Sequence, residues 1–292
     1  MNHVSSDAGH HRAAHQHEPD TDSQAEILDL DAEVLAEHIA SITAWLPLEK
    51  APRHIVDLGC GTGAGTFALL ARFPEAQVTA VDASDDHLRR LRARAAELGL
   101  AGQVHTVRAD LDADWPHLGR PGLDRPELVW ASASMHHMSD PDRTLRTVHE
   151  LLAPGGLFAV VELAGFPRFL PADAPADRPG LEERCHTALA HQEAAHMPHR
   201  GADWGPKLAA AGFGIEGERT ITVNVDGSGS AAVGRYALSS MKRLRAGAAH
   251  ALPAEDLAAL DRLLDAESPF SILRRDDLAV RTERGVWAAR RA

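Results

Sequence analysis

Two hydrophobic periods alternate along the first half of the chain and predict strands followed by helices. Short apolar runs rich in β-branched residues occur near 54–58, 77–82, 104–110 and 128–132, and the segment LLAPGGLFAVVE (151–162) gives a helix end, a turn and a fifth strand. Stretches with helical spacing of apolar residues separate them. This order predicts a doubly wound α/β fold, in which helices cover both faces of a mostly parallel sheet.

Further elements follow from the same pattern. Apolar residues on one helical face predict a helix over Ile27–Leu46, which Pro47 ends. The segment 166–180 is rich in Pro, Ala and Asp and predicts a loop. The remaining predicted helices are 65–73, 85–98, 141–152, 181–196, 201–212, 231–246 and 254–264, and the last strands are 219–225 and 279–288.

The first strand runs into HIVDLGCGTGAG, the most informative stretch of the chain. Glycine lets the backbone turn sharply and approach a ligand, and the next helix presents free N–H groups. Dinucleotide-binding turns need G-x-G-x-x-G, but here the third glycine would fall at Ala64 or Thr66. The turn therefore has the spacing G-x-G-x-G, through Gly59, Gly61 and Gly63.

Acidic residues end the next two strands, and histidines follow the fourth. Asp82 ends QVTAVD, where a carboxylate can hold ribose hydroxyls. Asp110 ends VHTVRAD, where it can accept a hydrogen bond from an exocyclic amine. The fourth strand continues into ASMHHMSDP.

Across residues 50–165 the chain resembles the class I S-adenosylmethionine-dependent methyltransferases. The resemblance rests on VDLGCGTG, AVDAS, VRADL, ASMHHMSDP and LLAPGGLFAVVE, in that order. It implies a seven-stranded Rossmann-like sheet with an antiparallel pair at one edge, and S-adenosyl-L-methionine as cofactor. The implied contacts are Gly59, Gly61 and Gly63 with the methionine part, Asp82 with the ribose, Asp110 with the adenine amine and Leu111 beside the ring. We also assign Asp57, Ala83 and Ser132 to this cofactor site.

The predicted organisation is a tail and one domain. Residues 1–23 are polar, lack a secretory h-region and predict a disordered tail. The methyltransferase domain spans 24–292, with a helical cap (24–47), a cofactor-binding core (50–165), a lid or substrate insertion (166–201) and C-terminal strands and helices (202–292). Metal capture by the tail is the alternative for His3, His10, His11, His15 and His17, although nothing fixes their geometry.

The composition of the chain limits the classes of partner and the compartment that we expect. The formal net charge of -12 argues against nucleic acid, because phosphate binding needs clustered Lys and Arg. Cys60 and Cys185 are the only cysteines and fit a reducing, cytoplasmic compartment. Pro154, Gly155, Gly156 and Glu162 break the longest apolar region, so we expect no membrane span. The oligomeric state stays open, and a homodimer is compatible with the sequence.

Methyl transfer needs an aligned acceptor and, for a weak nucleophile, a base, so histidine after the fourth strand is the natural candidate. We assign this role to His137 first and His136 second; the alternative is a packing or helix-capping role. Tyr236, outside the insertion, could donate into the substrate pocket; its alternative is a half-buried tyrosine of an added helix. A second polar group lies in the insertion and could form a wall of that pocket; its alternative is a solvated helix face. Its members are Cys185, His186, His191, Glu193, His196, His199, Arg200 and Asp203, and they match no metal motif, so we expect no metal site.

The chain lacks the Asn/Asp-Pro-Pro-Tyr/Phe pattern of methyltransferases that act on nucleic-acid bases. The sequence therefore predicts a methyltransferase acting on O, N or C of a small metabolite. The alternatives are a non-methylating enzyme of the same fold, a regulatory protein that only binds the cofactor, and a nicotinamide-dependent oxidoreductase. The glycine spacing and Asp110 count against the last.

Overall fold

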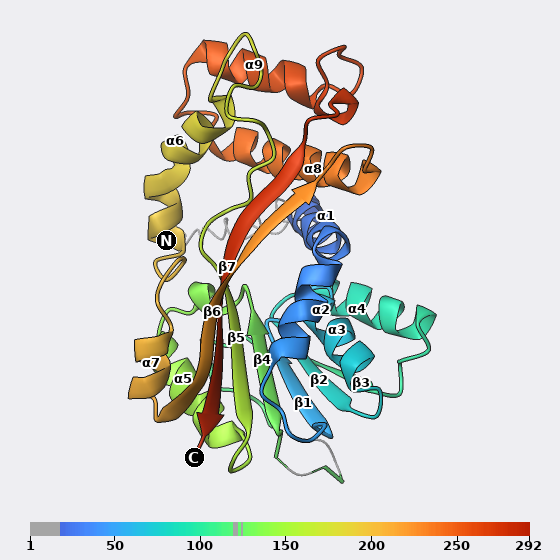
Figure 1. The fold of residues 1–292 in the computed structure, drawn as a ribbon, viewed down its shortest axis with the longest axis vertical. Coiled ribbons are helices and arrows are strands. Elements are labelled where there is room, and N and C mark those ends of the chain that lie inside the picture. The colour runs from blue at the N-terminus through green and yellow to red at the C-terminus, as the bar shows by residue number, and fades with distance from the viewer. Residues whose placement is uncertain (1–17, 119–121, 124) are drawn as a thin grey trace, which may run out of the picture.

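The computed structural model describes residues 18–118, 122–123 and 125–292, without the side chains of 18–22, 191–193 and 196. Its centre is a seven-stranded sheet in the order β3-β2-β1-β4-β5-β7-β6 (Figure 1). The strands are β1 (His54–Leu58), β2 (Gln77–Asp82), β3 (Val104–Arg108), β4 (Leu128–Ser132), β5 (Leu157–Leu163), β6 (Phe213–Asp226) and β7 (Ala279–Arg291).

The sheet has the predicted mostly parallel arrangement. β1 pairs in parallel with β2 and β4, and β5 pairs in parallel with β4. β7 alone runs antiparallel, between β5 and β6. Strand order reverses between β1 and β4, and the carboxyl ends at such a switch point form the usual ligand crevice of this architecture.

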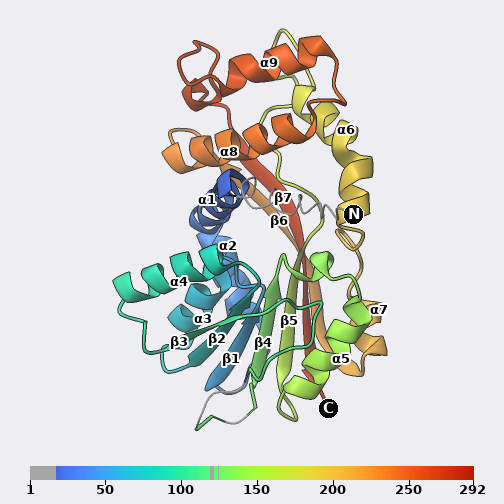
Figure 2. The same ribbon diagram turned by 180° about the vertical axis from the view of Figure 1, so that it is seen from behind.

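Helices cover both faces because the strands are apolar on both sides; every residue of β1 is buried. α2 (Ala36–Trp45), α3 (Ala64–Arg72) and α4 (Asp85–Glu97) lie on one face, and α5 (Pro141–Leu151) and α7 (Gly205–Ala210) lie on the other (Figures 1 and 2). Among the described residues, no helix is both long and apolar enough to cross a membrane.

A second layer of helices lies beyond the carboxyl ends of the parallel strands, and we call it the cap. The long hairpin of β6 and β7 reaches into it, and α8 (Ala231–Gly247) and α9 (Ala254–Leu264) connect these two strands (Figure 2). α6 (Leu181–His196) and α1 (Glu18–Val34) complete it. One apolar cluster joins these elements, including Leu35, Phe169, Ala237, Leu260 and Val280.

Three sequence predictions need correction. The helix predicted over 27–46 is two helices, because Leu35 and α1 pack into the cap whereas Ile42 of α2 packs against the sheet. α1 begins at Glu18, so residues 18–23 do not belong to the predicted tail; the rest of that tail lies outside the described residues. The helix predicted over 201–212 shrinks to α7, since Gly201 has φ +73° and Pro206 sets the first turn.

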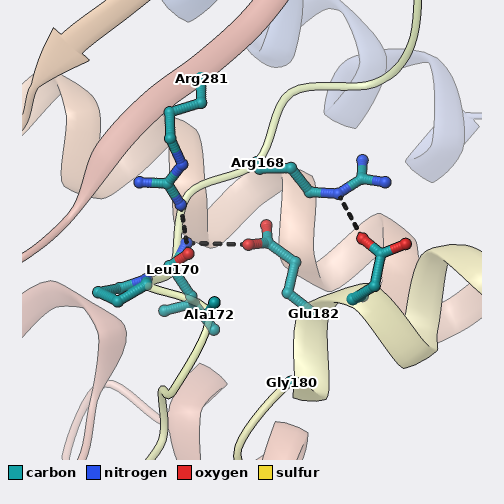
Figure 3. Close-up of a pocket in the computed structure, with 8 residues that line it drawn as sticks. Arg168, Leu170, Ala172, Gly180, Glu182 and Arg281 are labelled. Carbon is teal, nitrogen blue, oxygen red and sulfur yellow. Dashed lines mark hydrogen bonds and ion pairs between the residues drawn. The ribbon is translucent and has the colours of Figure 1, made fainter.

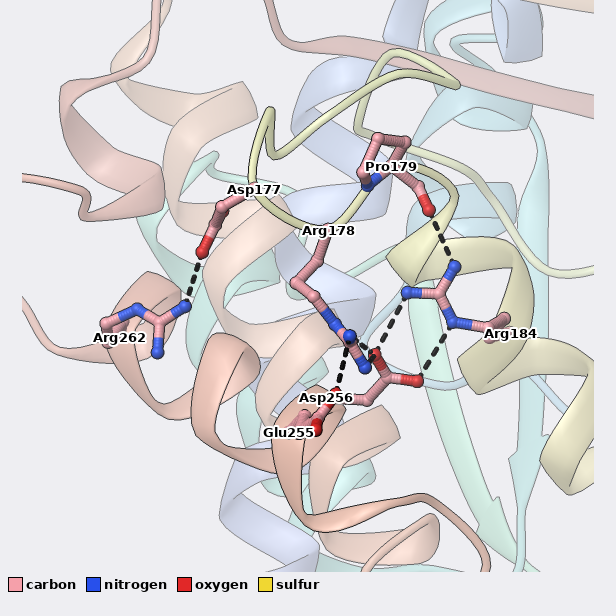
Figure 4. Close-up of polar contacts among 7 residues, drawn as sticks. All are labelled: Asp177, Arg178, Pro179, Arg184, Glu255, Asp256 and Arg262. Atoms are coloured by element: carbon pink, nitrogen blue, oxygen red, sulfur yellow. Dashed lines mark hydrogen bonds and ion pairs between the residues drawn. The ribbon is translucent and has the colours of Figure 1, made fainter.

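An ion-pair cluster ties α9 to the loop before α6 (Figure 4). Asp256 Oδ1 accepts from Nη2 of Arg178 at 2.6 Å, and its Oδ2 accepts from Nε of Arg184 at 2.9 Å. The Arg184 hydrogen bond is the largest effect on the pKa of Asp256, which lies below its usual range despite burial. Asp256 therefore contributes stability at neutral pH that is lost as pH falls through this lowered pKa.

Replacing Asp256 by Asn should lower the free energy of unfolding by about 1.5–3 kcal/mol, because charge-assisted hydrogen bonds to two arginines are lost. Urea denaturation measures the change. Glu255→Gln is the matched control: Glu255 also pairs with Arg178 but is 78% exposed, so its loss should cost less than about 1 kcal/mol. Equal costs in the two variants would contradict the assigned role of Asp256.

Candidate functional site

The glycine turn after β1 packs directly against the loop after β4. Gly59, Gly61 and Gly63 all have positive φ, at 65°, 53° and 106°. A Cβ built on Gly59 would lie 2.4 Å from Cβ of Ser134, so any larger residue there would displace one of the two loops. A Cβ on Gly61 would lie 3.2 Å from Cδ1 of Leu28, which places α1 of the cap over this turn.

Asp57 lies beneath the turn, where it is 2% exposed. The hydroxyl of Thr66, in the first turns of α3, donates to Asp57 Oδ2 at 2.6 Å. Burial raises the pKa of Asp57 to about 7, although the Thr66 hydrogen bond opposes the rise. Asp57 therefore links β1 to α3 through a carboxyl group whose pKa lies close to neutral pH.

Asp82 ends β2 and is held by three donors. Gly61 N–H donates to Oδ2 and Ser84 N–H to Oδ1, each at 2.8 Å, and His87 Nδ1 lies 3.2 Å from Oδ1. Burial would raise the pKa of Asp82, but the hydrogen bonds from His87, Ser84 and Gly61 outweigh it and lower the pKa. Asp82 is therefore a fixed carboxylate at the edge of the glycine turn.

The other predicted cofactor residues lie at neighbouring strand ends. Asp110 is exposed, and its Oδ1 accepts from the backbone N–H of Asp112 at 2.9 Å. Leu111 is buried beside it, Ala83 is exposed after β2, and Ser132 is half-buried at the end of β4. The structure thus brings Asp82 and the glycine turn into contact, and it places Asp110 and Leu111 one strand further out.

Glu162, which the sequence reasoning did not single out, organises the loop after β4. Its Oε1 accepts from the backbone N–H groups of Ser134 and Met135 at 3.1 and 2.7 Å, and its Oε2 lies 2.6 Å from His136 Nδ1. Glu162 and His136 are each only 2% exposed. This buried, hydrogen-bonded setting of His136 is the one that the packing alternative describes. A lone acid ending the apolar run AVVE was the available signal.

His137 has a different environment on the same short helix. Its ring lies 4.2 Å from the His136 ring, between centroids, and is reachable from solvent. Partial burial, and after it the neighbouring His136, lower the pKa of His137 below that of an ordinary histidine. Beyond His136, the charges of Glu162, Arg243 of α8 and Asp82 also act on the pKa of His137: Glu162 and Asp82 raise it, and Arg243 lowers it.

The backbone just before the short helix of His136 and His137 is unusual, because Ala133 has a positive φ of 51°. A non-glycine residue in this region costs of order 1–3 kcal/mol and is held only where surrounding contacts fix it. The backbone N–H of Ala133 donates to the carbonyl of Val161 at 2.8 Å. The strain therefore coincides with the loop that carries His136 and His137.

The described members of the polar group predicted in the insertion have separate surroundings. Cys185 is fully buried in the cap, and burial is the main cause that raises its pKa to about 11. Burial, and then Arg168 and Arg200, lower the pKa of His186 to about 3. His199 lies edge-on to Trp204, and Asp203 caps Gly205 N–H at 3.0 Å. The side chains of His191, Glu193 and His196 lie outside the described residues.

Tyr236, the predicted donor into the substrate pocket, is instead part of the cap interior. Its hydroxyl donates to Asp31 Oδ1 at 2.7 Å, and Arg284 binds both oxygens of Asp31 at 2.9 Å. In the described part of the chain, no three His, Cys, Asp or Glu side chains gather where they could hold a metal ion.

A cleft of about 630 Å³ opens between β7, the loop after β5 and the start of α6 (Figure 3). Glu182 lies between Arg281 and Arg168, and its oxygens accept from the backbone N–H groups of Phe169 and Leu170. Burial raises the pKa of Glu182, although these bonds and the two arginines oppose it. This carboxyl group closes the loop, and it fills the space between the two guanidinium groups.

Comparison with known proteins points to one family. The sequence family described as methyltransferase domain matches residues 56–158, which include the glycine turn, Asp82, Asp110 and both histidines of the β4 loop. The crystal structure of a Bacillus halodurans C-125 protein described as a methyltransferase covers 87% of this chain and 99% of its own, with a TM-score of 0.53 and 18% identity. That similarity supports the fold alone.

Curated relatives match in part. A trans-aconitate 2-methyltransferase from Acidovorax sp. (strain JS42) is 42% identical over 110 residues, 38% of each chain. Another from Methylobacterium radiotolerans is 38% identical over 121 residues, 41% of this chain and 42% of its own. A malonyl-[acyl-carrier protein] O-methyltransferase from Laribacter hongkongensis is 32% identical over 119 residues, 40% of this chain and 39% of its own. The match thus spans about two fifths of the length of these relatives.

The sheet order, the glycine turn at the switch point and the acids ending β2 and β3 define a Rossmann-like methyltransferase fold. Residues 56–158 match the methyltransferase-domain family, and this part of the chain carries the features of the class I S-adenosylmethionine-dependent methyltransferase family. The cofactor of this family is S-adenosyl-L-methionine.

Replacing Glu162 by Gln should destabilise the fold by about 1–3 kcal/mol, because an amide keeps one acceptor oxygen and turns an N–H₂ group toward buried donors. Urea denaturation of the variant measures this cost. Glu150→Gln, on an exposed position of α5, is the control and should change stability by less than about 0.5 kcal/mol. A Glu162 variant as stable as the control would show that the carboxylate does not hold the β4 loop.

Proposed function

We propose that this protein transfers the methyl group of S-adenosylmethionine to a small-molecule acceptor, through a site formed by the glycine turn, Asp82 and the β4 loop. The observation that supports this most directly is the placement of Asp82: a fixed carboxylate at the end of β2 that binds Gly61, in the turn that leaves β1 at the switch point of the sheet.

The residues present fit this cofactor. The turn through Gly59 and Gly61 has the left-handed backbone that glycine allows, it packs closely against Ser134, and Leu28 of α1 lies over it. Among the described residues, Asp82 Oδ2 accepts from a single backbone donor, and it keeps a lone pair for a ribose hydroxyl. Asp110, exposed at the end of the adjacent strand, would accept from the adenine amine, with Leu111 beside the ring.

The cofactor supplies an electrophilic methyl group on a sulfonium. His137 is the group that would accept the acceptor's proton, since it lies in the loop after β4 and its lowered pKa keeps the ring neutral near pH 7. His136 positions this loop through Glu162. The cap would exclude water and shape the acceptor pocket, because α8 brings Arg243 toward His137.

We infer that the acceptor is a small metabolite. The formal net charge of -12 disfavours a nucleic-acid acceptor. The names of the relatives suggest trans-aconitate and malonyl-acyl carrier protein as first acceptors to assay. The family match spans residues 56–158 and includes no helix of the cap, so we infer that the choice among O, N and C acceptors depends on residues outside this match.

S-adenosylhomocysteine should bind with micromolar or tighter affinity, about -8 kcal/mol or more favourable. Asp82→Ala should weaken binding by roughly 1.5–3 kcal/mol, because a charged acceptor for the ribose is lost. Isothermal titration calorimetry measures both, and Asp85→Ala on the exposed first turn of α4 is the control. Absence of binding to the wild-type protein, or tighter binding of NAD, would refute the proposed function.

His137→Ala should lower turnover by about 10²–10⁴-fold with an acceptor that needs a base, while the affinity for S-adenosylhomocysteine stays within a few-fold. Because the pKa of His137 is lowered, the acid limb of the wild-type pH–rate profile should lie below the pKa of an ordinary histidine and should disappear in the variant. Transfer of labelled methyl to the acceptor measures the profile. An unchanged rate and profile would leave His137 without a catalytic role.

A further inference from the structure

The carboxylate of Asp82 accepts hydrogen bonds from the glycine turn, from the residues just after β2, and from one side chain on α4. Two of its three donors are backbone N–H groups, of Gly61 and Ser84. The third is a side chain, the imidazole of His87 on α4, whose Nδ1 lies 3.2 Å from Oδ1. Asp82 therefore depends on a helix as well as on its own strand.

The N-terminal cap of α4 fixes the backbone of His87, and its burial restricts the ring. Ser84 is the N-cap residue, and its hydroxyl oxygen accepts from the backbone N–H of His87 at 3.3 Å. His87 itself is only 9% exposed. Leu88 and Leu91 pack α4 against Ala80 of β2, so the ring and the carboxylate belong to two elements that are packed together.

The chemistry of the contact fixes the direction of the hydrogen bond. A carboxylate only accepts, so Nδ1 carries the hydrogen and donates to Oδ1. Oδ1 then accepts from two donors, Ser84 N–H and His87, whereas among the described residues Oδ2 accepts from Gly61 N–H. The three bonds hold the plane of the carboxylate and direct the remaining lone pair of Oδ2 to a ligand.

We propose that His87 is a positioning residue of the cofactor site: it holds Asp82 in the orientation that binds a ribose hydroxyl. This inference rests on the proposed function, because it assumes that Asp82 binds the cofactor. His87 does not contact the cofactor in this proposal and acts through Asp82. The class of ligand group that it serves is a nucleoside diol.

The test is calorimetric titration of the full-length protein with S-adenosylhomocysteine. His87→Leu removes the donor and should weaken binding about five- to tenfold, as expected for one lost hydrogen bond. His87→Asn places an amide N–H near the position of Nδ1 and should bind within about twofold of wild type. His105→Leu, on an exposed position of β3, is the matched control and should bind like wild type.

A double-mutant cycle separates positioning from general packing. In an Asp82→Ala background, His87→Leu should cause no further loss of affinity, because the group through which it acts has been removed. Adenosine and 2′,3′-dideoxyadenosine provide a second readout: the His87→Leu variant should lose its preference for the diol. Melting temperatures of all variants show whether the fold is intact.

The possible outcomes distinguish the two proposals. No binding of S-adenosylhomocysteine to wild type refutes the proposed function. Binding to wild type together with unchanged affinity in His87→Leu overturns the role of His87 alone. Additive losses in the cycle, or no rescue by Asn in a folded variant, also overturn it, because a structural role would then explain the effect.

Discussion

The close approach of two loops at the switch point is the constraint on which the rest of this structure depends. Gly59, in the turn after β1, leaves no room for a side chain against Ser134. The Ser134 hydroxyl donates to the carbonyl of Leu58 at 2.9 Å and joins the same two loops. Because these loops leave adjacent parallel strands, their contact brings the predicted cofactor turn and the histidine loop to one edge of the sheet.

Three buried or half-buried acids surround this contact, and two of them, Asp57 and Asp82, show that hydrogen-bond partners as well as burial set the pKa of a carboxyl group. Asp57 has one side-chain donor, and burial raises its pKa to about 7. Asp82 lies on the next strand with three donors, and its pKa is lowered. Glu162 is committed to the β4 loop and to His136. The proposed methyl transfer assigns a separate task to each environment: supporting the turn, binding the ribose and holding the loop of His137.

The cap has its own apolar core and its own ion pairs, and it meets the sheet through the long hairpin of β6 and β7. Asp256 joins α9 to the loop before α6, and Asp31 joins α1 to β7 and α8. The family match ends at residue 158, before most of these elements. The matched region carries the proposed cofactor site, and the cap helices lie outside it. We therefore propose that the cap determines which acceptor is bound.

The sequence by itself determined the order of strands and helices, the glycine turn and the acids that end β2 and β3. These features are local: a period of two or of 3.6 residues, a glycine spacing and a strand end are all visible within a few residues. The same local signals predicted α6 and α9 with their observed bounds. The family resemblance, which rests on these motifs, implied an antiparallel pair at the sheet edge. The antiparallel pairing of β7 with β5 and with β6 confirmed it.

Only the tertiary structure decided which polar residues meet. Glu162 and His136 are 26 residues apart in sequence, and Tyr236 and Asp31 are 205 apart. No local pattern encodes such pairs, so the buried setting of His136 and the interior place of Tyr236 could not be chosen in advance. The helix break at Leu35 has the same origin, because its two sides pack against different apolar cores. Local spacing fixes elements, whereas burial and partner choice depend on contacts between distant segments.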